Sequence, residues 1–277
     1  MLSHWCTQRS SITRRGRGIG RWLIASLVVF LYLSLALPAA CSVHTPPGYD
    51  GHDYQKLVAF LEQPNGPGRN GDRTGVGTGY DPGDPSSWGG VTWSSATPKR
   101  VTSITWLSKD LSGVLDLSGC TELTRLYCND SRLTSLDVSG CSALVSLYCF
   151  RNQLTSLNVS GCANLVGLYC YYNELSSLDV SDCSALEGLF CYYNQLTSLD
   201  ISGCTALARV ECHDNQLSSL DVSGFTSLYA LICYNNLLTS LNVDGCTALK
   251  YLECYGNKLT SADLPSSLPV PGGRYLY

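Results

Sequence analysis

Charged residues are scarce in this sequence: Asp, Glu, Lys and Arg make up 14% of its 277 residues, whereas hydrophobic residues make up 44%. A chain of this composition can bury a core, which excludes a disordered protein and a long coiled coil. Its 11 Pro and 26 Gly are too few for a collagen-like helix. We therefore expect a folded protein with one large domain or two small ones.

Motifs for catalysis and metal binding are missing as well. The sequence contains no GxSxG or HExxH segment, no CxxC pair and only four His. We therefore predict that the protein is not an enzyme and that it binds no cofactor and no metal ion.

Two clusters of polar residues leave alternatives open. A hydrolytic site is conceivable where three residues of one repeat converge, namely Glu211, His213 and Asp214. An exposed polar patch is the favoured interpretation of that cluster. Calcium binding is conceivable in the Gly-rich stretch 66–88, through Asp72, Asp81 or Asp84. Their spacing matches no EF-hand loop, so an ordinary capping loop is favoured there.

Acidic residues are absent before residue 22, where five arginines lie: Arg9, Arg14, Arg15, Arg17 and Arg21. Residues 22–40 follow with no charge, and we predict an export signal over residues 1–40. Cys41 resembles the lipidated first residue of a bacterial lipoprotein, although Pro38 stands where such signals usually have Leu. The alternative is an uncleaved membrane anchor, because about 17 to 25 apolar residues can span a bilayer.

Without its basic N-terminal stretch the chain is acidic. Subtracting five Arg from 18 basic residues leaves 13 against 22 acidic residues, a net charge of -9. Binding to nucleic acid needs a basic surface, so nucleic acid is excluded as a partner. Membrane contact is expected only through the N-terminal signal or a lipid anchor at Cys41.

Leu and Asn recur every 21 residues. The leucines are Leu133, Leu154, Leu175, Leu196, Leu217, Leu238 and Leu259. The asparagines are Asn152, Asn173, Asn194, Asn215, Asn236 and Asn257, with Ser131 in the first full copy. A typical unit, residues 144–165, reads LVSLYCFRNQLTSLNVSGCANL, and a divergent 22-residue copy begins at Val101. A fixed period of this length predicts a repeat solenoid.

The repeat resembles the short bacterial class of the leucine-rich repeat family, with LxxLxCxxNxL in its first half and LxxLDV in its second. The match covers residues 101–263. Residues 53–106 look like the N-terminal cap that precedes such repeats. We therefore expect an export signal over 1–40, a capping region over 41–100, leucine-rich repeats over 101–263 and a C-terminal tail or cap over 264–277.

Each repeat is expected to form one rung with a single short parallel strand and little helix on its convex side. Leu147 and Cys149 alternate with Ser146 and Tyr148, as in a strand with one buried face. The remainder of the repeat is rich in Ser and Gly, so it should return by extended segments. Eight rungs at about 4.8 Å predict a stack of roughly 38 Å. The one helix expected lies near Asp53–Gln63.

Thirteen of the 15 cysteines lie on two ladders of the same period. One ladder is Cys128, Cys149, Cys170, Cys191, Cys212, Cys233 and Cys254, and the other is Cys120, Cys141, Cys162, Cys183, Cys204 and Cys246. Equivalent side chains of parallel strands are about 4.8 Å apart, beyond the usual Cβ separation of a disulfide. Phe225 replaces one member, so these positions are expected to hold free, buried thiols that act as apolar residues.

Aromatic residues are concentrated at outward positions next to the strands: Tyr127, Tyr148, Phe150, Tyr169, Tyr171, Tyr172, Phe190, Tyr192, Tyr193, Tyr234, Tyr251 and Tyr255. Tyr gives a large contact area with a polar tip, which suits a binding surface. The alternative is that these rings stack along the ladder and only stiffen it. The densest cluster lies beside Gly167 and Gly188, which are expected to leave open space above the sheet.

We therefore predict an exported or surface-anchored recognition module that binds a protein ligand through a tyrosine-rich concave face. The resemblance implies protein ligands most often. A carbohydrate-binding module and a passive spacer of the cell envelope are the alternatives. The expected ligand-binding residues are Tyr148, Phe150, Tyr169, Tyr171, Tyr172, Phe190, Tyr192 and Tyr193, with Arg209, Glu211, His213 and Asp214 at the charged border.

Overall fold

The computed structural model describes residues 44–74, 79–260 and 274–276. The predicted export signal, the predicted lipidation at Cys41 and most of the predicted C-terminal cap lie outside these residues. Contacts divide the chain into two compact units, Met1–Cys41 and Ser42–Tyr277. The second unit carries its own continuous apolar core, which is what independent folding requires. Among the helices described, none is both long enough and apolar enough to cross a bilayer.

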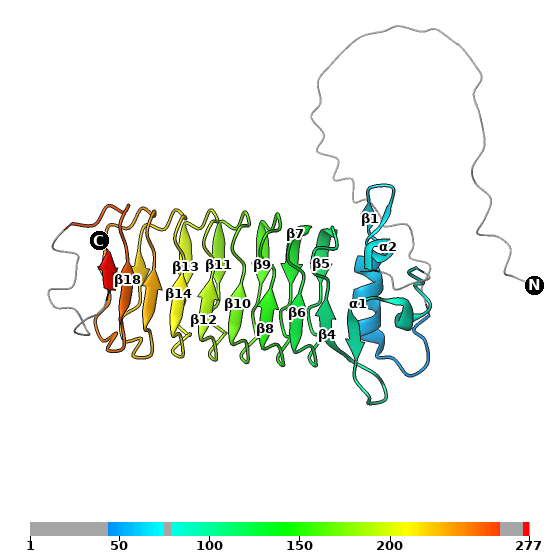
Figure 1. Ribbon diagram of the computed structural model, residues 1–277. Coiled ribbons are helices and arrows are strands. Elements are labelled where there is room, and N and C mark those ends of the chain that lie inside the picture. Colours follow the sequence, from blue (N-terminus) through cyan, green and yellow to red (C-terminus); the bar gives the residue numbers. More distant parts are fainter. Residues whose placement is uncertain (1–43, 75–78, 261–273, 277) are drawn as a thin grey trace, which may run out of the picture. The chain divides into compact units, whose positions relative to one another are not determined.

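The N-terminal cap is built on α1 (Gly51–Leu61), which confirms the helix expected near Asp53–Gln63. Asp50 caps this helix by accepting a hydrogen bond from the Asp53 N–H, and Leu57, Phe60 and Leu61 are buried on its inner face. Phe60 stacks on Trp106 at 5.4 Å between ring centroids. The helix α1 lies at the open end of the repeats (Figure 1). Its aromatic residue Phe60 therefore adds bulk to the core there.

Four short elements of the cap were not expected. They are β1 (Pro64–Asn65) paired with β2 (Gly68–Arg69), the helix α2 (Asn70–Thr74) and the 3-10 helix η1 (Pro85–Ser87). The buried amide of Asn70 donates to the carbonyls of Phe60 and Ser112, so tertiary contacts hold a segment whose Gly content predicts a loop. Trp88 follows η1 and is buried against Tyr54 at 5.2 Å.

One ten-stranded sheet runs along the repeats (Figure 1). In order its strands are β3 (Val91–Trp93), β4 (Val101–Thr105), β6 (Arg125–Tyr127), β8 (Ser146–Tyr148), β10 (Gly167–Tyr169), β12 (Gly188–Phe190), β14 (Arg209–Glu211), β16 (Ala230–Ile232), β18 (Tyr251–Glu253) and β19 (Arg274–Leu276). β3 is antiparallel to β4 and the other pairs are parallel. Pairing is in register, so equivalent residues of successive repeats lie side by side. The outward side of this sheet is called the sheet face below.

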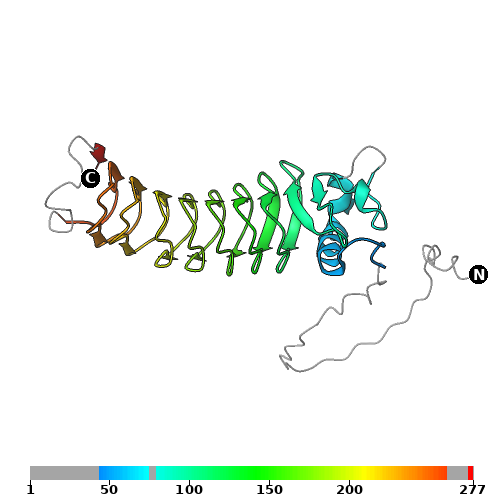
Figure 2. The same ribbon diagram turned by 90° about the horizontal axis from the view of Figure 1, so that it is seen from below.

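The opposite side of the repeats returns in extended segments, as predicted, and these also pair over short stretches (Figure 2). The strands are β5 (Ser112–Asp116), β7 (Arg132–Asp137) and β9 (Ser156–Asn158), then β11 (Ser177–Asp179) with β13 (Ser198–Asp200), then β15 (Leu220–Asp221) with β17 (Leu241–Asn242). Phe225 lies where the β13 and β15 ladders are separate, and it lines a hollow of about 660 Å³ there. The position where Phe replaces Cys is therefore also the place where the return strands of neighbouring rungs do not pair.

The core between the two sides consists of the Leu, Val and Cys ladders. Most of the inward positions expected from the pattern are fully buried, although Leu157 and Leu199 are only half-buried. The Asn ladder is structural, as expected: the Asn173 amide donates to the carbonyls of Cys149 and Cys170, and its oxygen accepts from the Leu154 N–H at 3.0 Å. The same bonds repeat in the next rungs, so each Asn joins two turns.

The thirteen ladder cysteines are free and buried, in agreement with the prediction. Those of the second ladder turn their thiols toward backbone carbonyls, for example Cys162 Sγ toward Val138 O at 3.2 Å. Burial raises the pKa of Cys128, Cys170 and Cys212 to about 12. These thiols are therefore protonated at neutral pH and behave as apolar core groups.

Candidate functional site: the aromatic sheet face

Each repeat turns a corner just after its sheet strand, at a residue with positive φ. These corner residues are Ser108, Asp130, Arg151, Tyr172, Tyr193, Asp214 and Asn235, with φ between 51° and 54°, and Gly256, with φ 66°. Asn and Asp adopt this left-handed conformation at little cost, whereas it is unfavourable for a bulky side chain. Tyr172 and Tyr193 therefore stand where the backbone disfavours them.

Behind the corners, rings stack along the repeats in what we call the long ladder: Phe150, Tyr171, Tyr192, His213, Tyr234 and Tyr255. Successive centroids are 4.3 to 4.6 Å apart, and no pair is tilted by more than 14°. The in-register strands set this spacing. Since each ring covers the faces of its neighbours, the ladder presents ring edges and hydroxyl groups to a partner.

A second, shorter ladder runs beside it through Tyr127, Tyr148, Tyr169 and Phe190. Its closest pair is Tyr148 with Tyr169, at 4.2 Å. A Cβ added at Gly167 or Gly188 would lie 3.1 Å from a ring carbon of Tyr169 or Phe190, respectively. The rings therefore lean over the two glycines and narrow the space directly above them.

A hollow of about 350 Å³ borders the two glycines on this face. The predicted residues Tyr148, Tyr169, Phe190 and Arg209 line it, together with Val145, Val166, Ala208 and Tyr229. Val145 and Tyr229 are exposed. The prediction named neither of them, because each precedes its strand by one residue and the 21-residue pattern does not mark that position as outward.

The corner pair Tyr172 and Tyr193 forms the outermost layer of the cluster. Their rings stack at 4.5 Å, and their exposed fractions are 42% and 43%. Each meets the long ladder edge-on, Tyr172 with Tyr171 and Tyr193 with Tyr192. The guanidinium of Arg151 lies 5.7 Å from the centroid of Tyr172. These two tyrosines are the most accessible of the eight aromatic residues predicted to bind ligand.

The predicted charged border divides into two separate pairs. Arg209 Nε donates to Glu211 Oε1 at 2.6 Å, while His213 Nδ1 lies 2.8 Å from Asp214 Oδ2. His213 is only 7% exposed, because it lies in the long ladder between Tyr192 and Tyr234. The expectation of an exposed histidine at the border is therefore wrong. The two acids have different partners, so the cluster does not form a hydrolytic triad.

Electrostatics keep the tyrosines of the long ladder neutral. Burial, with Tyr171 and Glu211 nearby, raises the pKa of Tyr192 to about 12. Burial, with Tyr255 and Asp214 nearby, raises the pKa of Tyr234 to about 12. The hydroxyl groups are therefore protonated at neutral pH, and they offer a partner hydrogen-bond donors as well as acceptors.

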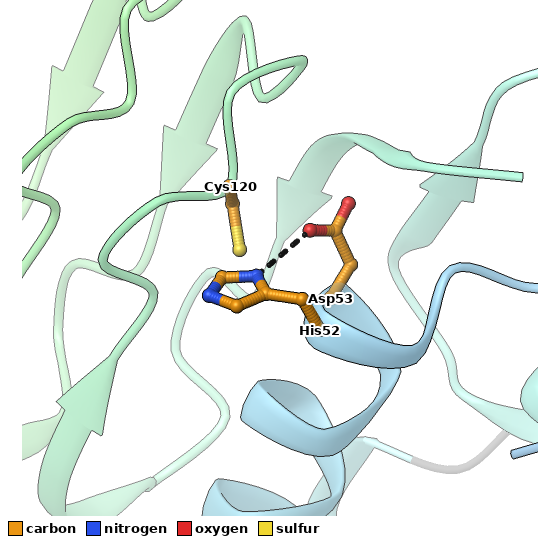
Figure 3. Close-up of side chains that lie close together, drawn as sticks. All are labelled: His52, Asp53 and Cys120. Carbon is orange, nitrogen blue, oxygen red and sulfur yellow. Dashed lines mark hydrogen bonds and ion pairs between the residues drawn. The ribbon is translucent and has the colours of Figure 1, made fainter.

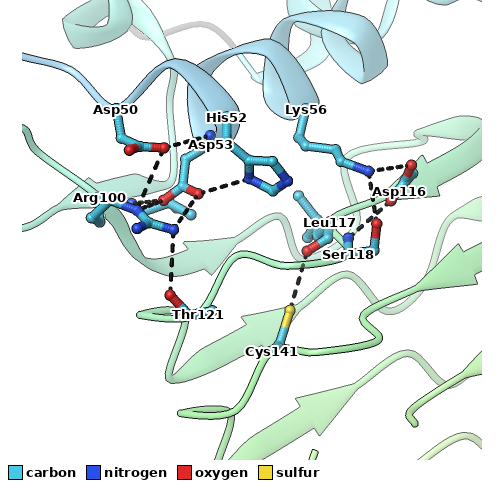
Figure 4. A network of polar contacts seen from close by, with 11 residues as sticks. Asp50, His52, Asp53, Lys56, Arg100, Asp116, Leu117, Ser118, Thr121 and Cys141 are labelled. Atoms are coloured by element: carbon cyan, nitrogen blue, oxygen red, sulfur yellow. Dashed lines mark hydrogen bonds and ion pairs between the residues drawn. The ribbon is translucent and has the colours of Figure 1, made fainter. Parts of the chain in front are cut away.

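His52, Asp53 and Cys120 bring three possible metal-ligand atoms within 4.8 Å of one another (Figure 3). Asp53 is already engaged: Arg100 Nε and the Val101 N–H each donate to its Oδ2 at 2.9 Å (Figure 4). Burial favours a higher pKa for Asp53, but these hydrogen bonds outweigh it and the pKa is lowered. A metal ion would have to sit beside a guanidinium, so we assign this network the role of joining α1 to the first repeat.

The aspartates considered for calcium are bound locally. Asp72 pairs with Arg69, Asp81 accepts from the Gly83 N–H, and Asp84 accepts from the Ser86 N–H and hydroxyl. These contacts close turns of the cap. They support the favoured interpretation of an ordinary capping loop.

The 21-residue period, the parallel sheet on one side, the extended return and the Leu and Asn ladders together define a leucine-rich repeat solenoid. This confirms the predicted fold class.

Three solved structures are similar to this chain. The functional domain of InlJ from Listeria monocytogenes, which includes a cysteine ladder, is 28% identical, with 59% of this chain and 45% of that one covered and a TM-score of 0.46. The leucine-rich repeat protein LIC12759 of Leptospira interrogans is 21% identical, with 55% and 50% covered and a TM-score of 0.42. YopM from Yersinia enterocolitica is 24% identical, with 56% and 38% covered and a TM-score of 0.42.

The match thus spans half or less of the length of each of these proteins. No protein-family model and no curated protein matches the chain.

Proposed function

We propose that this protein is an exported or surface-anchored recognition module, not an enzyme, and that it binds a protein ligand through its aromatic sheet face. The observation that carries the proposal is the corner pair Tyr172 and Tyr193. Both rings are exposed, and both residues have a left-handed backbone conformation.

The cost of this conformation argues for a role in binding. A residue other than Gly held in the left-handed region costs on the order of 1 kcal/mol or more. The corners at Asp130, Asp214 and Asn235 use residues that tolerate it. Strained positions of this kind cluster at functional sites. Exposed Tyr is also enriched among the residues that dominate protein interfaces.

The ring stacking favours a protein over a sugar as ligand. A sugar ring binds an aromatic residue through the flat face of the aromatic ring, and the faces inside the long ladder are covered by neighbours 4.3 to 4.6 Å away. What remains accessible is a row of edges and hydroxyl groups beside an apolar hollow. Side chains and backbone groups of a protein suit such a mixed surface better.

The proposed export rests on the arginine-rich start and the uncharged stretch 22–40. Export would bring the sheet face outside the cell, where it could bind a protein ligand.

Site-specific photo-crosslinking tests the proposal. A photoreactive phenylalanine analogue replaces Tyr172 in one version of the chain and Ser177 in another. Ser177 is exposed on the opposite side of the repeats, so it is the matched control. We expect a discrete protein adduct from position 172 that position 177 does not give. Equal adducts from both positions, or none, would favour the passive spacer, and retention on a glycan array would favour the carbohydrate-binding alternative.

A further inference from the structure

The six corner residues from Asp130 to Asn235 form a row along the repeats that we call the corner ridge. Each repeat contributes one residue, and the in-register strands keep the row aligned with the stacking direction. Along the chain the ridge reads Asp130, Arg151, Tyr172, Tyr193, Asp214 and Asn235. Its chemistry therefore changes from one rung to the next in a fixed order.

The order of residues along the ridge is complementary to the same order read backwards. When the ridge is turned about the midpoint between Tyr172 and Tyr193, Tyr172 lies opposite Tyr193 and Arg151 lies opposite Asp214. At the ends, Asp130 lies opposite Asn235. A two-fold axis generates every such contact twice, as in the isologous interface of a symmetric dimer. The reversed ridge thus supplies one aromatic centre and two Arg–Asp pairs.

The flanking rows do not oppose this arrangement. The exposed residues two positions after each corner form a row beside the ridge. In that row the same reversal places Gln153 opposite Gln216 and Glu174 opposite Gln195. No like charges meet there. In the long ladder, Tyr171 would lie opposite Tyr192.

The repeat spacing favours a second copy over an unrelated protein. Two copies share the same rise per rung, so a match at the central tyrosines continues to the charged pairs one rung further out. A partner without this period would lose register within a rung or two. The Arg151 side chain is available, because it is 61% exposed and its contact with Asp130 is 3.6 Å long. Asp214 is 20% exposed and already contacts His213 and Asn235, so it would take Arg151 of the second copy as an additional partner.

We propose that the corner ridge binds a second copy of this chain about a two-fold axis between Tyr172 and Tyr193. This inference rests on the proposed function, because it assigns the partner of the same protein-binding face. The contact centres on four tyrosine rings, with Arg151 of each copy paired to Asp214 of the other.

Charge reversal with sedimentation velocity tests the inference on the compact unit Ser42–Tyr277. Arg151→Asp places two Asp–Asp contacts in the dimer, and Asp214→Arg places two Arg–Arg contacts there. We expect each single variant to raise the dimer dissociation constant at least tenfold. The double variant, and an equimolar mixture of the two single variants, regain both Arg–Asp pairs and should dimerise within about threefold of the unmodified protein. Lys250→Asp, a charge reversal outside the ridge, should have no effect.

Two results would overturn the inference: a unit that stays monomeric at about 100 µM, or single variants whose mixture shows no rescue. A unit that is monomeric while position 172 still crosslinks to a different protein would refute the self-association alone and leave the proposed function standing. Absence of both dimer and adduct would refute both. Circular dichroism of each variant confirms that the fold is retained, so a loss of dimer reports on the contact.

Discussion

A residue's place in the rung decides what it does in this protein. Tyr171 and Tyr172 are neighbours in sequence, yet Tyr171 is half-buried in a stack and Tyr172 is an exposed corner residue with positive φ. Asn173 follows them and is buried, with both ends of its amide bonded to backbone groups. Three consecutive residues thus have three different roles: Tyr171 stiffens the stack, Tyr172 is exposed for contact with a partner, and Asn173 belongs to the core.

Asn173→Ala should be among the most damaging single changes in the repeats. It would leave the buried N–H of Leu154 without a partner and remove one of the two amide donors to each of the carbonyls of Cys149 and Cys170, which Asn152 and Asn194 would still contact. We expect a loss of about 2 to 4 kcal/mol in the free energy of unfolding, measured by denaturant titration. Gln153→Ala is the matched control, because Gln153 is exposed, and it should change stability by less than about 0.5 kcal/mol. Similar losses from both variants would contradict the structural role of the Asn ladder.

Tyr172→Asn separates binding from stability. Asn adopts the corner conformation with less strain than Tyr, which offsets the loss of stacking on Tyr193. We expect the melting temperature to stay close to that of the unmodified protein while the affinity for a protein captured at this face falls at least tenfold. Tyr148→Asn, within the short ladder, should instead lower the melting temperature. A stable variant with full affinity would move the binding site away from the corner.

The outward aromatic residues could be predicted from the period of 21, but their arrangement in space could not. The pattern distinguishes inside from outside, which placed Tyr148, Tyr169 and Tyr192 on the correct side. It does not specify side-chain torsion, so the rings leaning over Gly167 and Gly188 were missed. Nor does it identify positive φ, because Asp130, Arg151 and Tyr172 share that conformation without sharing chemistry.

The joint between α1 and the first repeat depends on a buried ion pair. Asp53 is fully buried and pairs with the guanidinium of Arg100, while His52 Nδ1 lies 3.3 Å from its Oδ1. Arg100→Leu would leave that carboxylate without its counterion, and we expect a loss of about 3 to 5 kcal/mol in the free energy of unfolding. Arg69→Leu is the control, since its pair with Glu62 is exposed and should matter by about 1 kcal/mol or less.

Acid titration provides a second measurement of the same joint. The pKa of Asp53 lies below its usual value of 3.8, so its contribution to stability is present above that value and is lost as the pH falls through the folded-state pKa. The unmodified protein should lose stability below about pH 4. Arg100→Leu removes the strongest of the interactions that lower this pKa and leaves the hydrogen bonds from Val101 and His52, so this part of the acid loss should shrink. An unchanged acid profile would show that another group controls it.

At the scale of elements, the repeating strands were predictable and the irregular ones were not. Alternation within each repeat predicts β8 and its equivalents, and the amphipathic segment predicts α1. By contrast, α2 forms because Asn70 is held by Phe60 and Ser112, which are distant in sequence. The gap between β13 and β15 was likewise not predicted, although Phe225 stands out in the sequence as a break in the second cysteine ladder.

For the molecule as a whole, the cysteine ladders predict sensitivity to alkali. Burial raises the pKa of Cys170 to about 12 and that of Cys204 to about 11, against a usual value of 9.0. A group whose folded-state pKa is raised contributes stability that is complete below the unfolded value and is lost as pH rises toward the folded value. Each buried thiol should therefore cost about 1.4 kcal/mol per pH unit above pH 9, up to its own pKa in the folded state.

With thirteen such thiols in one continuous core, this loss accumulates until it exceeds the total stability of a typical domain, about 5 to 15 kcal/mol. We expect the melting temperature to change little between pH 7 and 8.5, and cooperative unfolding to occur near pH 10 to 11.

Native protein at pH 8 should react with almost no thiol reagent, whereas denatured protein should expose all thirteen ladder thiols. Cys162→Val removes one titrating group at a position that accepts apolar residues, so it should shift unfolding to slightly higher pH at little cost at pH 7. A protein that stays folded at pH 11, or that shows no free thiols when denatured without reductant, would mean that the ladders are cross-linked rather than free.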